Sequence, residues 1–169
     1  MAMAAARPLL SIRPATADDV PLIRQLIAEL AEYERLADAA VATDDDLREQ
    51  LFSAQPAAEV LIGEVDGEAA GFALFFHNFS TFLGKRGLYL EDLFVRPQFR
   101  GLGLGKGLMI HLARLAIERG CGRFEWSVLD WNAPAIALYR ELGALPMDEW
   151  TVQRVSGDAL KALAAHDPA

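Results

Sequence analysis

A glycine-rich turn between a strand pattern and a helical pattern is the feature that most constrains the fold of this chain. The apolar run LYLEDLFV occupies residues 88–95, and the turn RGLGLGKG follows at residues 100–107. Leucines at 104, 108, 112 and 115 then recur at helical spacing. Glycines at such a junction let backbone N–H groups and the positive end of a helix surround an anion such as a pyrophosphate. The alternative is a glycine-rich turn that binds no ligand.

Two common phosphate-binding motifs do not fit this turn. Arg100 stands where a nucleotide P-loop requires its first glycine, and Gly107 replaces the hydroxyl residue that would bind magnesium. The dinucleotide fingerprint fails because it needs a glycine at position 106, which is Lys106. The pattern that remains is Arg100-x-x-Gly103-x-Gly105, between a long strand and a helix.

Hydrophobic spacing and turn residues predict the element order β α α β β β α β α β α. Thr16 and Thr43, each with an aspartate three residues later, indicate helix starts, as does Asn132 before a first-turn proline. We expect the first helix to end near residue 36, and Asp66 with Gly67 to form a tight hairpin. The order predicts a mixed α/β domain. The predicted strands cover residues 9–13, 59–65, 68–79, 88–95, 124–129 and 150–155, and a terminal helix covers residues 158–165.

Composition favours a single globular domain over residues 1–169. With 169 residues and 53% hydrophobic content, the chain can bury a core without disulfide or metal. Cys121 is the only cysteine, so no disulfide can form within the chain and a reducing compartment is expected. His77, His111 and His166 lack the spacing of a metal site, and we predict no metal.

Charge and hydropathy limit the partners. The formal charge of −8 argues against nucleic-acid binding and is compatible with a cationic substrate. Arg7 and Pro8 interrupt the N-terminal apolar residues, and no apolar run approaches the roughly 20 residues that a membrane span needs. We therefore expect a cytoplasmic protein that does not partner a membrane.

The motif around the glycine turn resembles the GCN5-related N-acetyltransferase (GNAT) superfamily. The resemblance rests on Arg100-x-x-Gly103-x-Gly105 after LYLEDLFV, and on DWNAPAIALYRELGA at residues 130–144. It is closer to the diamine (spermidine/spermine) and thialysine N-acetyltransferase branch, from IRPAT at residues 12–16 through the terminal helix. It implies the GNAT fold, a central, mixed, mostly antiparallel twisted sheet flanked by helices. It also implies acetyl-CoA as donor, a primary amine as acceptor, direct transfer without an acyl-enzyme, and a homodimer.

Two adjacent carboxylates in the strand before the turn are candidates for acid–base chemistry. An alkylammonium with a pKa near 10 must lose a proton before its nitrogen can attack a thioester. Glu91 and Asp92 point to opposite faces of a regular strand, so we expect them to have different roles. The resemblance assigns the general base to Glu91, with Asp92 assisting or positioning water. The alternative for either residue is a core ion pair with an arginine.

The helix that begins at Asn132 supplies the candidate general acid. Tyr139 lies two turns after Asn132, and a phenol can protonate a departing thiolate. The resemblance assigns that role to Tyr139, while a core aromatic is the alternative. For Asn132 a simple helix cap is as good an explanation as a contact with the cofactor. Backbone N–H groups near Leu93 to Val95 would hold the oxyanion, which requires a local break in strand pairing.

The resemblance also implies a cofactor site along the strand, the turn and the following helix. The pantetheine arm would lie on the strand, the pyrophosphate on the turn, and the amide region beside Asn132 and Tyr139. The strand residues are Leu93, Phe94 and Val95, and the turn residues are Arg100, Gly101, Leu102, Gly103, Leu104, Gly105 and Lys106.

Acceptor specificity rests on fewer residues. Tyr33 and Glu34 match polyamine-contacting positions of the family, although a solvated helix face explains them almost as well. Ser80 and Phe82 stand where diamine enzymes carry an acidic residue and a tryptophan, and SVLDWN with VSGDALKALA favours the thialysine branch. Trp150 closes part of the acceptor pocket or is an interface aromatic. The expected acceptor is a thialysine-like amino acid or a diamine or polyamine. The alternatives are a protein or peptide lysine acetyltransferase and a non-catalytic acyl-CoA-binding regulatory module.

Overall fold

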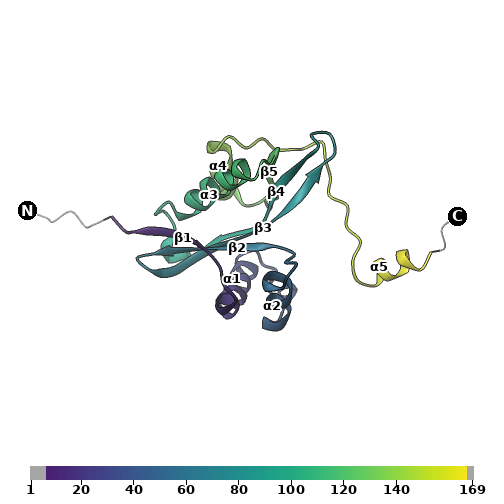
Figure 1. Ribbon diagram of the computed structural model, residues 1–169, viewed down its shortest axis with the longest axis horizontal. Coiled ribbons are helices and arrows are strands. Elements are labelled where there is room, and N and C mark those ends of the chain that lie inside the picture. The colour runs from purple at the N-terminus through teal and green to yellow at the C-terminus, as the bar shows by residue number, and fades with distance from the viewer. Residues whose placement is uncertain (1–6, 167–169) are drawn as a thin grey trace, which may run out of the picture. The chain divides into compact units, whose positions relative to one another are not determined.

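The computed structural model describes residues 7–166 in two compact units, which meet in sequence between Leu129 and Asp130. The first unit is built on one five-stranded sheet with the strand order β1-β2-β3-β4-β5 (Figure 1). Its strands are β1 Leu10–Pro14, β2 Glu59–Val65, β3 Glu68–Ser80, β4 Lys85–Val95 and β5 Arg123–Trp126. Its helices are α1 Val20–Tyr33, α2 Asp44–Phe52 and α3 Leu104–Glu118, with 3₁₀ turns η1 Ala17–Asp19, η2 Ala37–Ala39 and η3 Pro97–Phe99. The second unit contains α4 Ala133–Glu141 and α5 Gly157–Ala164.

The sheet is mixed and mostly antiparallel, as predicted. Strands β1 to β4 pair antiparallel in sequence order, and β5 alone pairs parallel, on the outer edge of β4. The predicted hairpin forms because Asp66 and Gly67 both take positive φ angles, 51° and 82°, between Val65 and its partner Glu68.

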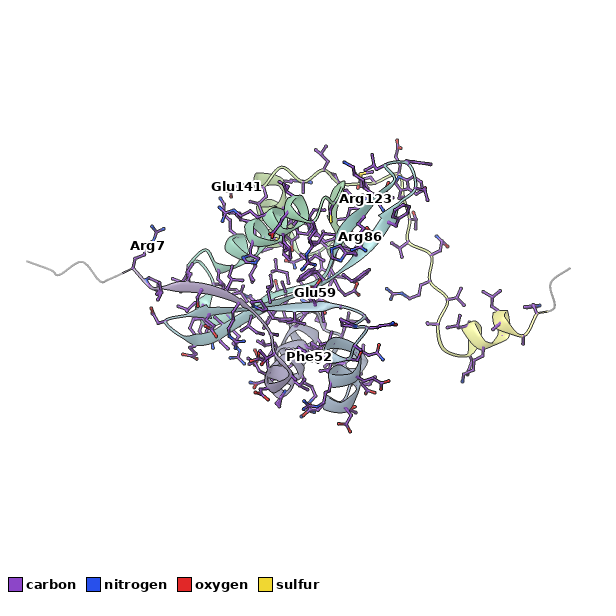
Figure 2. The ribbon with its side chains drawn as sticks, viewed as in Figure 1. Arg7, Phe52, Glu59, Arg86, Arg123 and Glu141 are labelled. Atoms are coloured by element: carbon purple, nitrogen blue, oxygen red, sulfur yellow. The ribbon has the colours of Figure 1, made fainter. Side chains whose placement is uncertain are left out.

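Helices cover both faces of the sheet, with α1 and α2 on one side and α3 on the other (Figure 1). Alternation along β2 explains this layering, since Ile62 joins the core beneath α1 and α2 while the next residue, Gly63, faces Leu104 of α3. In Figure 2, Phe52 marks the end of α2 and Glu59 the start of β2. The core beneath α1 and α2 contains Val20, Ile23, Leu26, Leu30, Leu47, Leu51, Val60, Ile62, Phe72 and Phe94.

The predicted helix starts are confirmed, and one helix end differs. Thr43 accepts a hydrogen bond from the Asp46 backbone N–H at 3.2 Å, and the Asp19 carboxylate accepts one from the Thr16 N–H at 2.8 Å. Helix α1 ends at Tyr33 rather than near residue 36, because Arg35 takes a φ of 62° and cannot continue the helix.

The strand predicted at residues 150–155 is wrong. This segment of the second unit is irregular, and Trp150 and Val152 are each 76% exposed. An apolar and polar alternation becomes a strand only where a neighbouring backbone completes the ladder, and no strand of residues 7–166 pairs with this segment. Strand β5 also stops at Trp126, short of the predicted Leu129. Within residues 7–166, no helix has the length and apolarity needed to cross a membrane.

Candidate active site

A bulge in β4 sets the geometry of the candidate acid–base residues. Leu90 pairs with Phe75 and Asp92 pairs with Leu74, so Glu91 is an extra residue on β4. The pairing of β4 with β5 ends at Leu90, and beyond it residues 91–95 have a strand neighbour on the β3 side alone, within the part of the chain described. The expected break in pairing therefore lies at Glu91, whereas Leu93 to Val95 remain paired with β3.

Asp92 faces the layer of α1 and α2. Its cross-strand partner Leu74 packs against the core beneath these helices, and Phe94, two residues further along β4, belongs to that core. Asp92 is partly buried and Glu91 is exposed. The pKa of Asp92 is raised to about 6, mainly by burial and in addition by the neighbouring charges of Glu91 and Glu34. The two carboxylates have different environments, as predicted.

Glu34 is a third carboxylate near Asp92 and Glu91. It caps the C-terminus of α1, is partly buried, and has its pKa raised by that burial. Its charge acts on Asp92, so residues that are 58 positions apart in sequence form one acidic cluster with Glu91. We define the carboxylate cluster as Glu34, Glu91 and Asp92. Three neighbouring carboxylates attract a cation, which is what a protonated amine acceptor is.

Arg100 links the predicted cofactor turn to the predicted acceptor residue Tyr33. Its Nε–H donates to the Val95 carbonyl oxygen at 2.9 Å. Its guanidinium lies over the Tyr33 ring at 4.6 Å and near the Phe94 ring at 5.7 Å. The structure therefore places Arg100 against α1 and the end of β4.

The glycine turn has the geometry of an anion cradle. Gly101 and Gly103 take φ angles of 79° and 93°, a region that favours glycine, and Gly103 caps the N-terminus of α3. Leu102 and Lys106 are exposed, and Gly105 lies against Val95. Leu104 is 1% exposed and its side chain packs in the core, so it can offer the cofactor its backbone but not its side chain.

An open hollow of about 720 Å³ lies beside Arg100, and we call it the α1 hollow. Arg96 donates to both Glu29 oxygens at 2.9 Å and to the Ala69 carbonyl at 2.8 Å. This hydrogen-bonded pair lowers the pKa of Glu29. The α1 hollow is lined by Gln25, Glu29, Glu32, Tyr33, Phe94, Arg96, Pro97, Gln98 and Arg100.

The second unit carries the other predicted site residues. The Asn132 side chain accepts a hydrogen bond from the Ala135 N–H at 3.4 Å and caps α4. A contact between Asn132 and the cofactor stays a prediction. Tyr139 lies in α4 and is partly buried. Trp150 lies outside any helix or strand and is mostly exposed.

Comparison with known proteins decides the family. A model described as the acetyltransferase (GNAT) family matches residues 23–144, which is more than half of the chain. The chain belongs to the GNAT family. This GNAT enzyme is 36% identical over 197 residues to an L-ornithine N5-acetyltransferase of Arabidopsis thaliana, covering 90% of this chain and 86% of the relative. It is 37% identical over 164 residues to a thialysine N-epsilon-acetyltransferase of Sus scrofa, covering 90% and 96%.

A solved structure supports the same fold for this GNAT enzyme. An integron cassette protein from the mobile metagenome of V. cholerae superposes with a TM-score of 0.79 and 29% identity, covering 93% of this chain and 98% of that one. The predicted fold, the resemblance to this branch of the family and the acetyltransferase class are all confirmed. Use of acetyl-CoA follows from the family.

The residues of this GNAT chain fit acetyl-CoA. A Cβ built on Gly101 or Gly103 meets no atom within 4 Å, so backbone N–H groups at the start of α3 are accessible to a pyrophosphate. The β4 edge beyond Leu90 can accept the amide groups of a pantetheine arm, since no described strand covers it. Within the described residues, no group of three or more His, Cys, Asp or Glu side chains could hold a metal ion.

Two features of this GNAT site were not predicted from the sequence. The Glu29–Arg96 pair joins residues 67 positions apart, and no local pattern signals such a contact. The second feature is the close approach of β3 and β4 at Gly71, where a Cβ would lie 2.3 Å from the Phe94 carbonyl oxygen. An isolated glycine inside a strand pattern is the one signal that could have indicated this close approach.

Proposed function

We propose that this GNAT enzyme acetylates a primary amine of a small cationic acceptor, with the carboxylate cluster receiving the amine. The observation that carries the proposal is the position of Asp92, partly buried beside Glu34 and next to the open edge of β4. The relatives named for ornithine and thialysine support an acceptor that carries a side-chain amine. An acidic cluster attracts the ammonium form of such an acceptor.

We propose Asp92 as the proton acceptor in preference to Glu91. A base works best when its pKa lies near the working pH, and burial with the charges of Glu91 and Glu34 raises the pKa of Asp92 to about 6. One proton of the ammonium group passes to Asp92, and the neutral nitrogen bonds to the acetyl carbon. The bond from that carbon to sulfur then breaks, and the nitrogen loses its second proton to solvent. Tyr139 gives its phenol proton to the departing sulfur. Backbone N–H groups on the open edge of β4 stabilise the oxyanion.

This assignment predicts a pH dependence of kcat/KM. Asp92 must be ionised to accept a proton, so kcat/KM should rise with pH through a midpoint near 6, where the Asp92 carboxyl loses its proton. The measurement is kcat/KM for one amine from pH 5 to 8. A Glu91→Gln variant should keep the rise with a lower midpoint, because the Glu91 charge helps to raise the pKa of Asp92. Loss of the rise in that variant would assign the base to Glu91.

Tyr139→Phe should lower kcat about 100-fold, because the variant keeps the ring and removes the proton for the leaving thiolate. Thiol release from acetyl-CoA measures this rate. Tyr89→Phe is the matched control, since Tyr89 hydrogen-bonds Ser127 at 2.9 Å and has no assigned catalytic role. Equal rates for wild type and Tyr139→Phe would remove Tyr139 from the mechanism.

The test of the proposed function is amine-dependent thiol release with a panel of acceptors. Spermidine, putrescine, ornithine, lysine, thialysine and a lysine peptide are each tested with protein shown to be folded by circular dichroism. We expect turnover with at least one free amine and little with the peptide. Acetyl-CoA binding without amine-dependent release would favour a non-catalytic acyl-CoA-binding module, and turnover of the peptide alone would favour a protein acetyltransferase.

A homodimer and a cytoplasmic location stay predictions. Sedimentation of the purified protein measures the first, and fractionation of the cells that produce it measures the second.

A further inference from the structure

The Glu29–Arg96 pair joins three elements through one guanidinium. Arg96 is the first residue after β4, and its Nε–H and one terminal N–H donate to the two Glu29 oxygens of α1, each at 2.9 Å. The other terminal nitrogen donates to the Ala69 carbonyl oxygen of β3 at 2.8 Å. The side chains of Arg96 and Glu29 are 14% and 28% exposed. Two parallel hydrogen bonds with so little exposure fix the direction of the contact as well as its length.

This pair connects the two segments that line the α1 hollow. Helix α1 contributes four of the lining residues, and the segment 94–100 contributes the other five. Side chains do not fill the space between the two segments, so apolar contacts hold them less firmly there than in the core. The Glu29–Arg96 pair is a directed contact across this space, and it fixes the distance between α1 and the segment that follows β4.

The end of α1 determines where Glu34 lies. The buried residues of the helix finish at Leu30, and Glu34 caps its C-terminus. Glu29 lies five residues before Glu34, which is about 7.5 Å along the helix axis. A contact that fixes Glu29 therefore constrains the last turn of the helix and the carboxylate that follows it.

Arg96 lies equally close in sequence to the other members of the carboxylate cluster. It follows Asp92 by four residues, and Asp92 and Glu91 are both in β4. The pair thus ties the helix that carries Glu34 to the strand that carries the other two carboxylates. The energy between charges depends on their separation, and the charge of Glu34 acts on Asp92. A shift of the end of α1 would therefore change the attraction of the cluster for an amine.

We propose that the Glu29–Arg96 pair is a positioning device for acetyl transfer, which holds the end of α1 against β4 and sets the distance between Glu34 and the other two carboxylates. The inference rests on the proposed function and adds two positioning residues to it. Neither residue gives or takes a proton in the reaction, and both act through Glu34. The alternative is a pair that stabilises the fold and has no effect on the reaction.

A charge-neutral double variant separates positioning from stability. Glu29→Met/Arg96→Met removes one charge of each sign and supplies apolar chains of similar length, a replacement that often leaves stability unchanged or higher. The thermal midpoint should therefore not fall. The KM for the panel amine that wild type acetylates fastest should rise about 10-fold, because Glu34 is no longer held at the cluster. The KM for acetyl-CoA should not change, because the Arg96 backbone N–H still donates to the Ala70 carbonyl oxygen at 2.8 Å.

The pH profile is a readout that a purely structural pair would not move. Glu34 helps to raise the pKa of Asp92, so the midpoint of kcat/KM against pH should lie lower in the double variant than in wild type. Glu59→Met/Arg119→Met is the matched control, because Arg119 likewise donates to both oxygens of Glu59 and joins β2 to the end of α3. This control should keep the amine KM and the midpoint of wild type.

Arg96→Lys applies the same test without loss of charge. A lysine cannot make two parallel hydrogen bonds to a carboxylate, so this variant should show part of the rise in the amine KM. Wild-type values of the amine KM and the midpoint in the double variant, or in Arg96→Lys if the double variant does not fold, would overturn the positioning role alone. Absence of transfer to every amine by wild type would overturn the proposed function and the positioning role with it.

Discussion

Asp92→Asn is expected to lower kcat/KM at least 100-fold, more than any other single change in the carboxylate cluster. The asparagine has nearly the same shape and cannot take a proton, so the acceptor amine stays protonated and cannot attack. Glu91→Gln should cost less, about 10-fold or below, because Glu91 is exposed and contributes mainly its charge. Steady-state rates at amine concentrations below KM, with saturating acetyl-CoA, measure kcat/KM for both variants.

The two variants also serve as controls for each other. Both remove one negative charge from adjacent residues of β4, so a purely electrostatic role would lower their rates equally. A larger loss in Glu91→Gln would return the base role to Glu91. The thermal midpoint of Asp92→Asn should not fall, since burial disfavours the charged carboxylate that this change removes.

Gly71→Ala should destabilise the fold by about 3 kcal/mol, the upper end of the usual cost of overpacking. Its Cβ would lie 2.3 Å from the Phe94 carbonyl oxygen and 3.1 Å from the Val95 Cα, and both are backbone atoms that no side-chain rotation can move. Strand β4 must shift at the residues predicted to line the pantetheine arm. The KM for acetyl-CoA should rise together with the loss of stability.

Gly107→Ala is the matched control for this effect. Its new Cβ would make an ordinary contact with Ile12 at 3.7 Å, and alanine is the better helix former within α3. Urea denaturation should show Gly107→Ala as stable as wild type or about 0.5–1 kcal/mol more stable. Equal stability of Gly71→Ala and wild type would mean that β3 and β4 do not approach as closely as described.

Elements with local signals could be predicted from the sequence. The Thr43 cap, the hairpin at Asp66 and Gly67, and the glycine turn before α3 each depend on residues within one or two turns of each other. Their physics is local, because a cap or a positive φ is decided by the residue itself and its near neighbours.

Features that depend on distant partners could not be predicted. The alternation at residues 150–155 is typical of a strand, yet a strand also requires a neighbour that sequence does not identify. Glu91 and Asp92 are adjacent and chemically similar, and Asp92 is the partly buried member because it faces the layer of α1 and α2. The charge of Glu34, which also acts on Asp92, comes from a distant part of the chain. The stack of Arg100 on Tyr33 likewise joins a turn and a helix that are far apart in the chain.

The most direct test of the central claim is a competition for one labelled acetyl group. Acetyl-CoA with an isotopically labelled acetyl group is incubated with the enzyme and an equimolar mixture of ornithine, lysine, putrescine, spermidine and a lysine peptide, and the products are identified by mass spectrometry. The account predicts label on the side-chain nitrogen of a small free amine, lost in Asp92→Asn. Label on the peptide alone, or on no amine while acetyl-CoA is bound, would contradict it.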